Sequence, residues 1–339
     1  MTVNLPTLEG YQQYLLTEYS NFPRGRYVSL IIIRKTESET IFRTEGSGEG
    51  LVKETVWAGL RDVHQIPFRR VMITKRKQTA VERRTGRELL RAHGMLKRPL
   101  KKGKEDGPEC SLNTNAPCER CIDCFLYGFA AGGGGAQKSR VMTEDAFSIG
   151  SVAQVTGRRT FNATFDNGTM RSPIDGKPST SISEDEFVRP EAHFLDIETL
   201  KDVKPWELQY VIGNIMRSAR YGAISSRMGR IKNTIAAVVF SDCELFSNLE
   251  LTHAVYDRLH PTAAEDLVFP LSDAIVAQAV QGSIEQLVQQ VVSRAPVVVQ
   301  GEALMQIIGE TITLFRSDDH VQELLTKIDA GYDNAVGRQ

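Results

Sequence analysis

The run YVSLIIIRK, residues 27–35, places the strongest constraint on the fold. It is rich in β-branched residues, its centre is wholly apolar, and Gly25 bounds it on the N-terminal side. A short continuous apolar run of this kind is typical of a strand buried within a protein. We therefore expect residues 27–35 to form the central strand of a sheet.

Two further segments predict regular structure. The apolar residues of KPWELQYVIGNIMRSAR, residues 204–220, keep to helical spacing, and Pro205 suits a first helical turn. The run TIAAVVFS, residues 234–241, predicts another buried strand, and the remainder of the chain predicts helices with apolar stripes.

Long irregular segments separate these elements. Residues 61–135 are basic, cysteine-bearing and loop-rich, which indicates an insertion in a larger fold. Residues 156–194 alternate around the turn signal Asp166-Asn167-Gly168, which predicts a long protruding β-hairpin. The order strand, insertion, strand, hairpin, helix, strand favours an interrupted ferredoxin-like α+β domain. That domain would comprise residues 1–60, 136–155 and 195–339, the last including C-terminal helices.

Formal charge is distributed unevenly along the chain. The overall net charge is -1, yet residues 61–104 hold fifteen Lys/Arg against three Asp/Glu, and residues 241–339 hold five against fifteen. Many charge runs are only solvated faces, but this positive excess is larger than solubility needs and favours nucleic-acid contact. The acidic segment can shield that surface or meet that of a neighbouring copy. The start of the chain lacks signal-peptide features and no run of eighteen apolar residues occurs, so we expect a cytoplasmic protein without membrane contact.

Four cysteines lie within fifteen residues. Cys110, Cys118, Cys121 and Cys124 form a C-x7-C-x2-C-x2-C pattern in a reducing compartment where disulfides are disfavoured. Four thiolates at this spacing can hold one structural Zn²⁺, which would stabilise a loop that has no core of its own. An iron–sulfur cluster and an unligated set of thiols remain alternatives. Cys243 is expected to be an ordinary buried thiol.

The stretch GGGGAQKSR, residues 132–140, resembles a phosphate-binding loop but does not meet its requirements. Gln137 stands where the second glycine belongs, and the following residues predict a strand instead of the helix whose N-terminus would hold the phosphate. What remains is a glycine run that brings Lys138 and Arg140 to the start of a strand, which suits a long polyanion.

A second cationic segment is RSARYGAISSRMGRIKN, residues 217–233. Its five cations are Arg217, Arg220, Arg227, Arg230 and Lys232, interleaved with Gly222 and Gly229. Cations at a helix C-terminus would explain two of them but not all five. Glycines let backbone approach a phosphate closely, so we expect phosphate contacts here.

Hydrolytic chemistry has little support. The six histidines are scattered, and neither H-E-x-x-H nor G-x-S-x-G occurs. Glu37, Glu39 and Glu45, near the end of the first strand, remain candidate carboxylates for a metal-dependent nuclease.

Two of these segments together indicate a family. KSRVMTEDAF, residues 138–147, resembles the S-R-[hydrophobic]-x-x-x-D-A segment of the RAMP superfamily of CRISPR effector proteins, and YGAISSRMGRIKN resembles its glycine- and arginine-rich loop. With the basic cysteine-bearing insertion and the length, the chain is most similar to the Cas-seven backbone subunit of type I-D effector complexes (Cascade). The resemblance covers nearly the whole chain.

This resemblance implies an RRM-like palm, a zinc-bearing finger at residues 61–135 and a thumb hairpin at residues 156–194. It implies antiviral defence in which copies polymerise head to tail along CRISPR RNA and present it to target DNA, or to RNA, beside large, small and guide-end-capping subunits. A guide of any sequence must be held by its phosphates and riboses. The implied guide contacts are Lys138, Ser139, Arg140, Arg217, Arg220, Tyr221, Gly222, Arg227, Arg230 and Lys232.

Other implied contacts rest on analogy. A thumb that crosses the guide needs an apolar wedge, for which Phe161, Phe165 and Met170 are candidates. Arg69, Arg70, Lys75, Arg76 and Lys77 are candidates to hold target DNA. Related subunits that cut RNA use an acidic residue in a palm loop, but no Asp follows the first strand here, so we expect a non-catalytic scaffold. A metal-dependent nuclease, or a zinc-stapled RNA- or DNA-binding protein outside CRISPR, are the alternatives.

Overall fold

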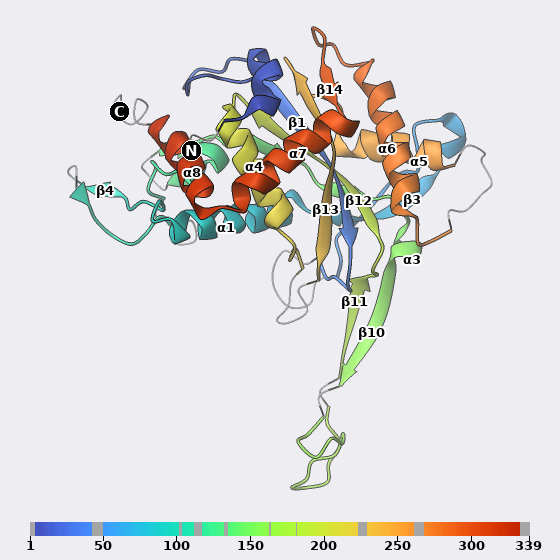
Figure 1. The fold of residues 1–339 in the computed structure, drawn as a ribbon. Helices are drawn as coiled ribbons and strands as arrows, with labels where there is room; N and C mark the ends of the chain where they lie inside the picture. Colours follow the sequence, from blue (N-terminus) through green and yellow to red (C-terminus); the bar gives the residue numbers. More distant parts are fainter. Residues whose placement is uncertain are drawn as a thin grey trace.

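The computed structural model describes residues 4–42, 50–101, 104–111, 117–131, 135–162, 164–180, 182–222, 229–260 and 268–332. Within them, an α+β fold is built on one large antiparallel sheet (Figure 1). The strands follow the order β14 (Val297–Val299), β13 (Ile231–Ser241), β1 (Tyr27–Thr36), β12 (His193–Lys201), β9 (Ala146–Ser148), β3 (Pro67–Ile73) and β2 (Lys53–Trp57), and β8 (Val141–Thr143) also pairs with β12.

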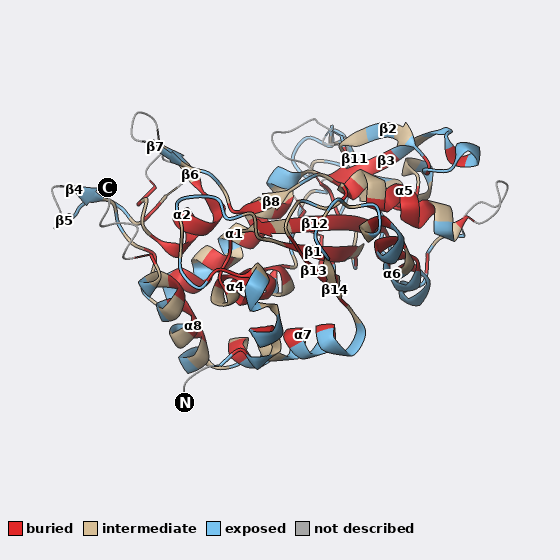
Figure 2. Cartoon of the chain, turned by 90° about the horizontal axis from the view of Figure 1, so that it is seen from above, coloured by how far each residue is buried: buried red, intermediate tan, exposed pale blue. Residues whose placement is uncertain are grey.

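Strand β1 is central, as its sequence predicts, because both faces of the sheet are covered (Figure 2). Val28, Leu30 and Ile32 join a core that includes α4 (Pro205–Arg217), α7 (Gly301–Phe315) and α8 (Asp318–Ala330). Ile31 and Ile33 point to the opposite face and join a core with α5 (Asn248–Leu259) and α6 (Asp273–Val288). Alternate side chains of a strand face opposite sides, so a strand covered on both sides needs a continuous apolar run.

The helix predicted from Pro205 is confirmed as α4. Leu208, Val211, Ile212 and Ile215 are buried on its inner face. Glu207, three residues after Lys204, caps the helix start by accepting the Lys204 backbone N–H at 2.7 Å. The stretch after GGGGAQKSR forms β8 and β9 instead of a helix, as expected.

The proposed finger, residues 61–135, contains two structurally different parts. Strand β3 belongs to the large sheet, and α1 (Lys75–Ala92) packs against α4. The rest contains only short elements, namely β4 (Leu100–Lys101), β5 (Lys104–Glu105), α2 (Ile122–Tyr127) and β6 (Phe129–Ala131), with β7 (Gly135–Gln137) pairing with β6.

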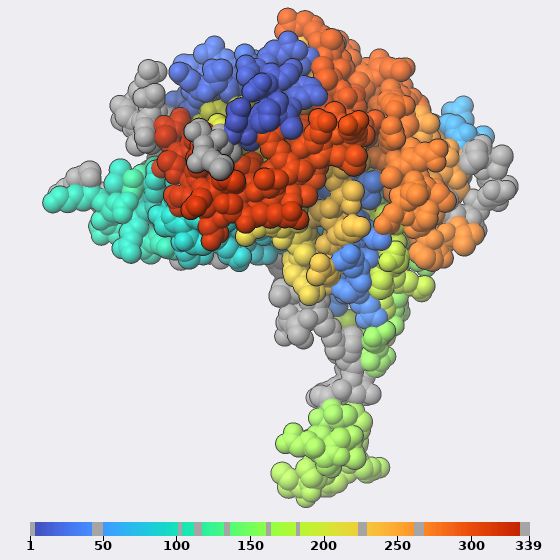
Figure 3. Space-filling view, in the orientation of Figure 1, coloured from blue at the N-terminus to red at the C-terminus, as the bar shows by residue number. Residues whose placement is uncertain are grey.

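A two-stranded hairpin projects from one end of the large sheet (Figures 1 and 3). Its strands are β10 (Thr156–Asn162), which follows the short helix α3 (Val152–Val155), and β11 (Ile182–Val188). The turn predicted at residues 166–168 is present, with the Gly168 N–H donating to the Phe165 carbonyl at 2.8 Å. None of the helices in the described ranges is long and apolar enough to cross a membrane.

Candidate metal centre and nucleic-acid interface

The four clustered cysteines converge in space. Cys118 and Cys121 precede α2, Cys124 lies within it, and Cys110 comes from the chain after β5. All four are buried, and their Sγ atoms lie within 4.8 Å of one another. The Sγ of Cys124 is 3.5 Å from that of Cys110 and 3.9 Å from that of Cys118. This arrangement can hold a metal ion.

The sulfur atoms strongly affect one another's protonation. Hydrogen bonds with Cys118, Cys121 and Cys124 hold the pKa of the Cys110 thiol below its usual value. The corresponding contacts with Cys110 and Cys118, together with burial, raise the pKa of Cys121 well above its usual value. Without a cation the cluster therefore cannot hold four thiolates, which is the property expected of a ligand set that a metal completes.

Helix α1 holds the cysteine-bearing segment against the body of the protein. Arg83 and Arg87 both donate to the buried Asp123 carboxylate in α2, at 2.8 and 2.7 Å. Arg87 Nη1 also lies 3.7 Å from the Cys110 Sγ. The sequence analysis counted these arginines in a surface that attracts a polyanion. Their spacing of four residues, which places them on one helix face, was the signal for a shared internal partner.

Four of the predicted RNA-contact residues gather near the base of the hairpin. Arg217, Arg220, Arg230 and Lys232 are all exposed. Lys232 pairs with Lys35 in the sheet register, and Arg220 forms a β-bridge with Arg230. We call these four residues the arginine patch. Two cations that sequence reasoning missed, Arg158 and Arg159 of β10, expose 75% and 56% of their side chains on the hairpin itself.

The predicted contacts near Lys138 lie at the other end of the sheet. Lys201 donates its backbone N–H to the Arg140 carbonyl and pairs with Tyr27, the first residue of β1, whereas Lys232 pairs with Lys35. The strand rise puts these two ends about 25 Å apart. Lys138 is exposed, and the Ser139 hydroxyl donates to the Val141 carbonyl at 2.6 Å. The sequence grouped residues that the fold separates.

Three residues predicted to contact nucleic acid are buried, which corrects those assignments. Arg140 pairs with Glu207, and Arg70 donates to the carbonyls of Ser148, Ile149 and Ala58. Tyr221 donates to Glu82 at 2.7 Å. Because their polar atoms are used internally, we assign these three residues to holding the fold together.

Tyr221 belongs to a buried cluster around Arg34, which sequence reasoning missed. The Arg34 guanidinium contacts three carboxylates, those of Asp196 at 2.6 Å, Glu198 at 2.7 Å and Glu82 at 2.9 Å. Arg34 ends the apolar run of β1, where an arginine is ordinarily expected to reach solvent.

The remaining predicted residues have varied placements. Gly222 is buried, while Arg227 lies outside the described residues. Phe165 and Met170 are half-buried in the loop beyond the hairpin strands, and the side chain of Phe161 is outside the described part. Among the predicted DNA contacts, Arg69, Lys75 and Arg76 are exposed and Lys77 is half-buried.

The candidate nuclease carboxylates form ion pairs. Glu37 accepts from Arg230 at 2.7 Å, and Glu39 pairs with Arg159 at 2.5 Å. Glu45 falls outside the described residues. Among the residues that the structure describes, the cysteine set alone meets the geometry of a metal site.

The fold and the cysteine site define a class: α+β proteins with a large antiparallel sheet, a projecting hairpin and a buried set of metal-ligand residues. Within that class, the chain belongs to the Csc2 Crispr family, whose family model matches residues 14–325. The resemblance to CRISPR effector proteins seen in the sequence is thereby confirmed. No curated protein matches the chain.

Solved structures share this fold. Csc2 of Thermofilum pendens, known from a crystal structure, is 17% identical, with a TM-score of 0.61 and 98% of each chain covered. A chain of a CRISPR RNA-guided surveillance complex in a pre-nicking state is 10% identical, with a TM-score of 0.47, 85% of this chain covered and 99% of the other. A chain of another CRISPR RNA-guided surveillance complex is 11% identical, with the same TM-score and coverage.

Proposed function

We propose that this protein is the CRISPR RNA-binding backbone subunit of a type I-D Cascade, acting in the cytoplasm as a non-catalytic scaffold. The observation that carries the proposal is the arginine patch at the base of a projecting hairpin. Exposed cations on a rigid sheet edge can hold phosphates of any sequence, which is what a guide-RNA scaffold requires. Membership of the Csc2 Crispr family agrees with this role.

The sheet supports an RRM-like palm. In a ferredoxin-like domain the four strands follow the order 4-1-3-2 with two helices on one face. Here β13, β1, β12 and β3 take those places, with β8 and β9 inserted beside β12, and α1 and α4 pack against each other. The hairpin suits the thumb, and Phe161, Phe165 and Met170 remain the wedge candidates.

We further propose that Cys110, Cys118, Cys121 and Cys124 hold a structural Zn²⁺. Zinc–thiolate bonds of about 2.3 Å in a tetrahedron separate the sulfur atoms by about 3.8 Å. The observed separations of 3.5 and 3.9 Å suit one ion better than a larger iron–sulfur cluster. When bound, the ion would supply cross-linking of the insertion and not catalysis, since all four ligands come from the protein.

Assembly on the guide would be head to tail. A heterologous contact that does not close into a ring produces an open helix, which suits a linear RNA. Target DNA would lie along Arg69, Lys75, Arg76 and Lys77, and the large, small and guide-end-capping subunits would complete the complex. The ion pairs of Glu37 and Glu39 favour a structural role for those residues over metal-dependent cleavage.

Native mass spectrometry on RNAs of increasing length tests this proposal. We expect one further subunit for each fixed increment of RNA, with one zinc per subunit in the same spectrum. A stoichiometry that stays constant at every length would instead favour a zinc-stapled binder outside CRISPR.

A patch variant tests the contact itself. Arg217→Ala combined with Arg220→Ala should weaken binding of unrelated RNA sequences equally and lower the salt dependence. Arg316→Ala, which removes an exposed arginine after α7, is the matched control.

A further inference from the structure

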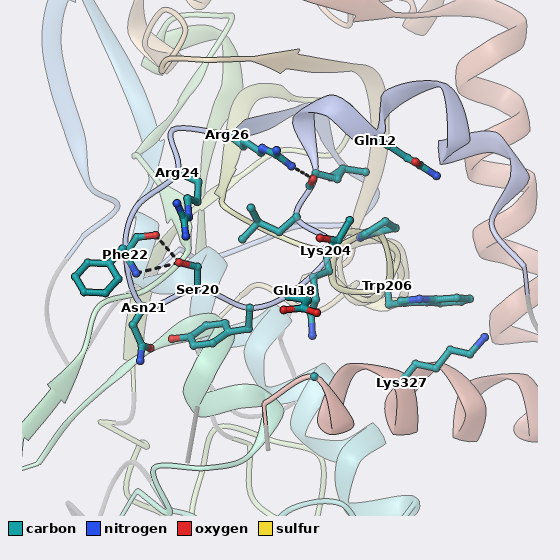
Figure 4. Close-up of a pocket in the computed structure, with 16 residues that line it drawn as sticks. Gln12, Glu18, Ser20, Asn21, Phe22, Arg24, Arg26, Lys204, Trp206 and Lys327 are labelled. Carbon is teal, nitrogen blue, oxygen red and sulfur yellow. Dashed lines mark hydrogen bonds between the residues drawn. The ribbon is translucent and has the colours of Figure 1, made fainter. Parts of the chain in front are cut away.

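A large groove lies at the end of the sheet opposite the hairpin. Its volume is about 1040 Å³, and it is formed by the chain from Gln12 to Arg26, the start of α4 and the end of α8 (Figure 4). Trp206 begins α4 and Arg217 ends it, so about 17 Å of helix separates the groove from the arginine patch. The groove is therefore a separate surface.

The lining of the groove is cationic. It holds Arg24, Arg26, Lys204 and Lys327 against a single acidic residue, Glu18. The Arg24 side chain is exposed and has no ion-pair partner among the described residues. An anionic ligand would thus meet an excess of positive charge.

Lys204 is the most informative of these cations because it is only 5% exposed. Its Nζ donates to the Ile328 carbonyl at a long 3.4 Å and lies 4.6 Å from the Tyr332 ring, but it forms no ion pair within the described part of the chain. Burial lowers the pKa of this lysine. A buried ammonium group without a paired carboxylate is costly, and a bound anion would compensate for that cost.

The surrounding backbone leaves room for this ammonium group. A Cβ at Gly331, which also lines the groove, would lie 2.0 Å from the Lys204 Nζ. A glycine at this position lets the end of α8 pass close to the lysine without displacing it.

Aromatic rings accompany the cations. Phe22 is 77% exposed, and Figure 4 places it and Trp206 at opposite ends of the groove with Lys204 between them. The loop that carries Phe22 is held by the Asp202 carboxylate, which accepts the backbone N–H groups of Arg24 and Arg26 at 2.9 and 3.0 Å. The ring is therefore presented on a preorganised turn.

The exposed cations also continue toward Lys138. Tyr19 lines the groove and hydrogen-bonds with Gln137, the residue before Lys138. Interleaved cations and exposed rings, fixed before a ligand arrives, are the features of single-strand nucleic-acid sites, where phosphates meet the cations and bases stack on the rings.

We propose that this groove binds a short single-stranded nucleic-acid segment, with a phosphate at Lys204 and Arg24 and a base stacked on Phe22. The volume suits several linked nucleotides better than one small ligand. This contact goes beyond the guide contact proposed above and lies at the other end of the sheet, so the two can be separated by experiment.

Photo-crosslinking combined with affinity measurement tests the proposal. Single-stranded RNA and DNA of one sequence, each carrying photoreactive uracil bases, are crosslinked to the full chain and the modified peptides are mapped. We expect crosslinks within residues 19–24. A stronger signal with RNA would assign the groove to a guide, and a stronger signal with DNA to a target strand.

Variants provide the second readout. Phe22→Ala combined with Arg24→Ala should weaken binding by about tenfold, since stacking of one base is worth about 1–3 kcal/mol. Gly331→Ala, which displaces the Lys204 ammonium group, should weaken it without touching either residue. Gly309→Ala in α7, whose Cβ would meet nothing within 4 Å, is the control. Thermal unfolding of each variant reports whether it is folded.

The outcomes separate this proposal from the proposed function. Absence of crosslinks in residues 19–24, with the affinity of the groove variants within twofold, overturns the groove while an effect of Arg217→Ala with Arg220→Ala keeps the guide contact. Retained groove crosslinks with an ineffective patch variant would support the groove and contradict the guide contact. Binding of an acidic peptide in place of nucleic acid would also overturn this proposal.

Discussion

Arg140 and Glu207 form a buried two-pronged ion pair that joins the segment before β8 to the first turn of α4. Arg140 Nη2 donates to the Glu207 Oε1 at 2.6 Å and Nη1 donates to Oε2 at 3.0 Å. Arg140 also donates to the carbonyls of Phe125 and Asp202, so it links three segments. Its place in the sequence suggested a guide contact, but its surroundings identify a cross-link of the fold.

Removing the arginine should therefore destabilise the protein. Arg140→Ala leaves the Glu207 carboxylate buried without its cation, and we expect a loss of about 3–5 kcal/mol in the free energy of unfolding. Arg140→Met combined with Glu207→Leu should lose less than the two single changes together. Denaturant unfolding measures both, and RNA affinity at equal folded fraction should stay within twofold. A large, selective loss of affinity would restore the guide-contact assignment.

The acid side of the stability profile should depend on the same pair. Burial raises the pKa of Glu207, but the charge and hydrogen bonds of Arg140 more than offset this and hold it below the usual value. A depressed folded-state pKa stabilises the protein above the unfolded pKa, about 4.3, and that stability is lost as pH falls through the folded value. Glu207→Gln should therefore flatten the decline of unfolding free energy below about pH 4.

The cluster around Arg34 should act in the opposite direction. Burial and the neighbouring Glu82 raise the pKa of Glu198 well above its usual value, so the folded state retains a proton that the unfolded state has released. Such a group favours folding below the unfolded pKa, and its contribution is lost as pH rises. Glu198→Gln keeps the oxygen that accepts from Arg34 and should gain stability relative to the parent between about pH 4 and pH 8. Equal pH profiles of unfolding free energy for the two proteins would contradict a retained proton.

Prediction from the sequence succeeded where the signal is local. The apolar run of β1, the helical spacing of α4 and the close cysteines each specify their structure within a few residues. It failed for Arg140, Arg70 and Tyr221, because their partners lie far along the chain and a single sequence does not show which cation is buried. The groove was missed for the same reason, since three distant segments form it.

The cysteine set should be necessary for metal retention and for order in the insertion. Cys118→Ser combined with Cys121→Ser removes two ligands and should lower bound zinc from one equivalent to none. Amide hydrogen exchange should rise in α2 but stay slow in β1, which has its own core on both faces. Cys243→Ser, outside the cluster, should keep the metal. A full equivalent of zinc in the double variant would refute the ligand assignment.

Glu37 gives the clearest distinction between a scaffold and a nuclease. Its carboxylate pairs with Arg230 of the arginine patch, so Glu37→Gln releases a cation and should tighten RNA binding by about twofold, an effect that added salt weakens. Glu244→Gln removes an equal charge from an exposed position near the far end of β13 and controls for net charge. A catalytic carboxylate would behave differently, since its removal would leave affinity unchanged and abolish cleavage of a bound strand in the presence of Mg²⁺. Affinity and cleavage measured on the same preparations therefore decide between the two roles.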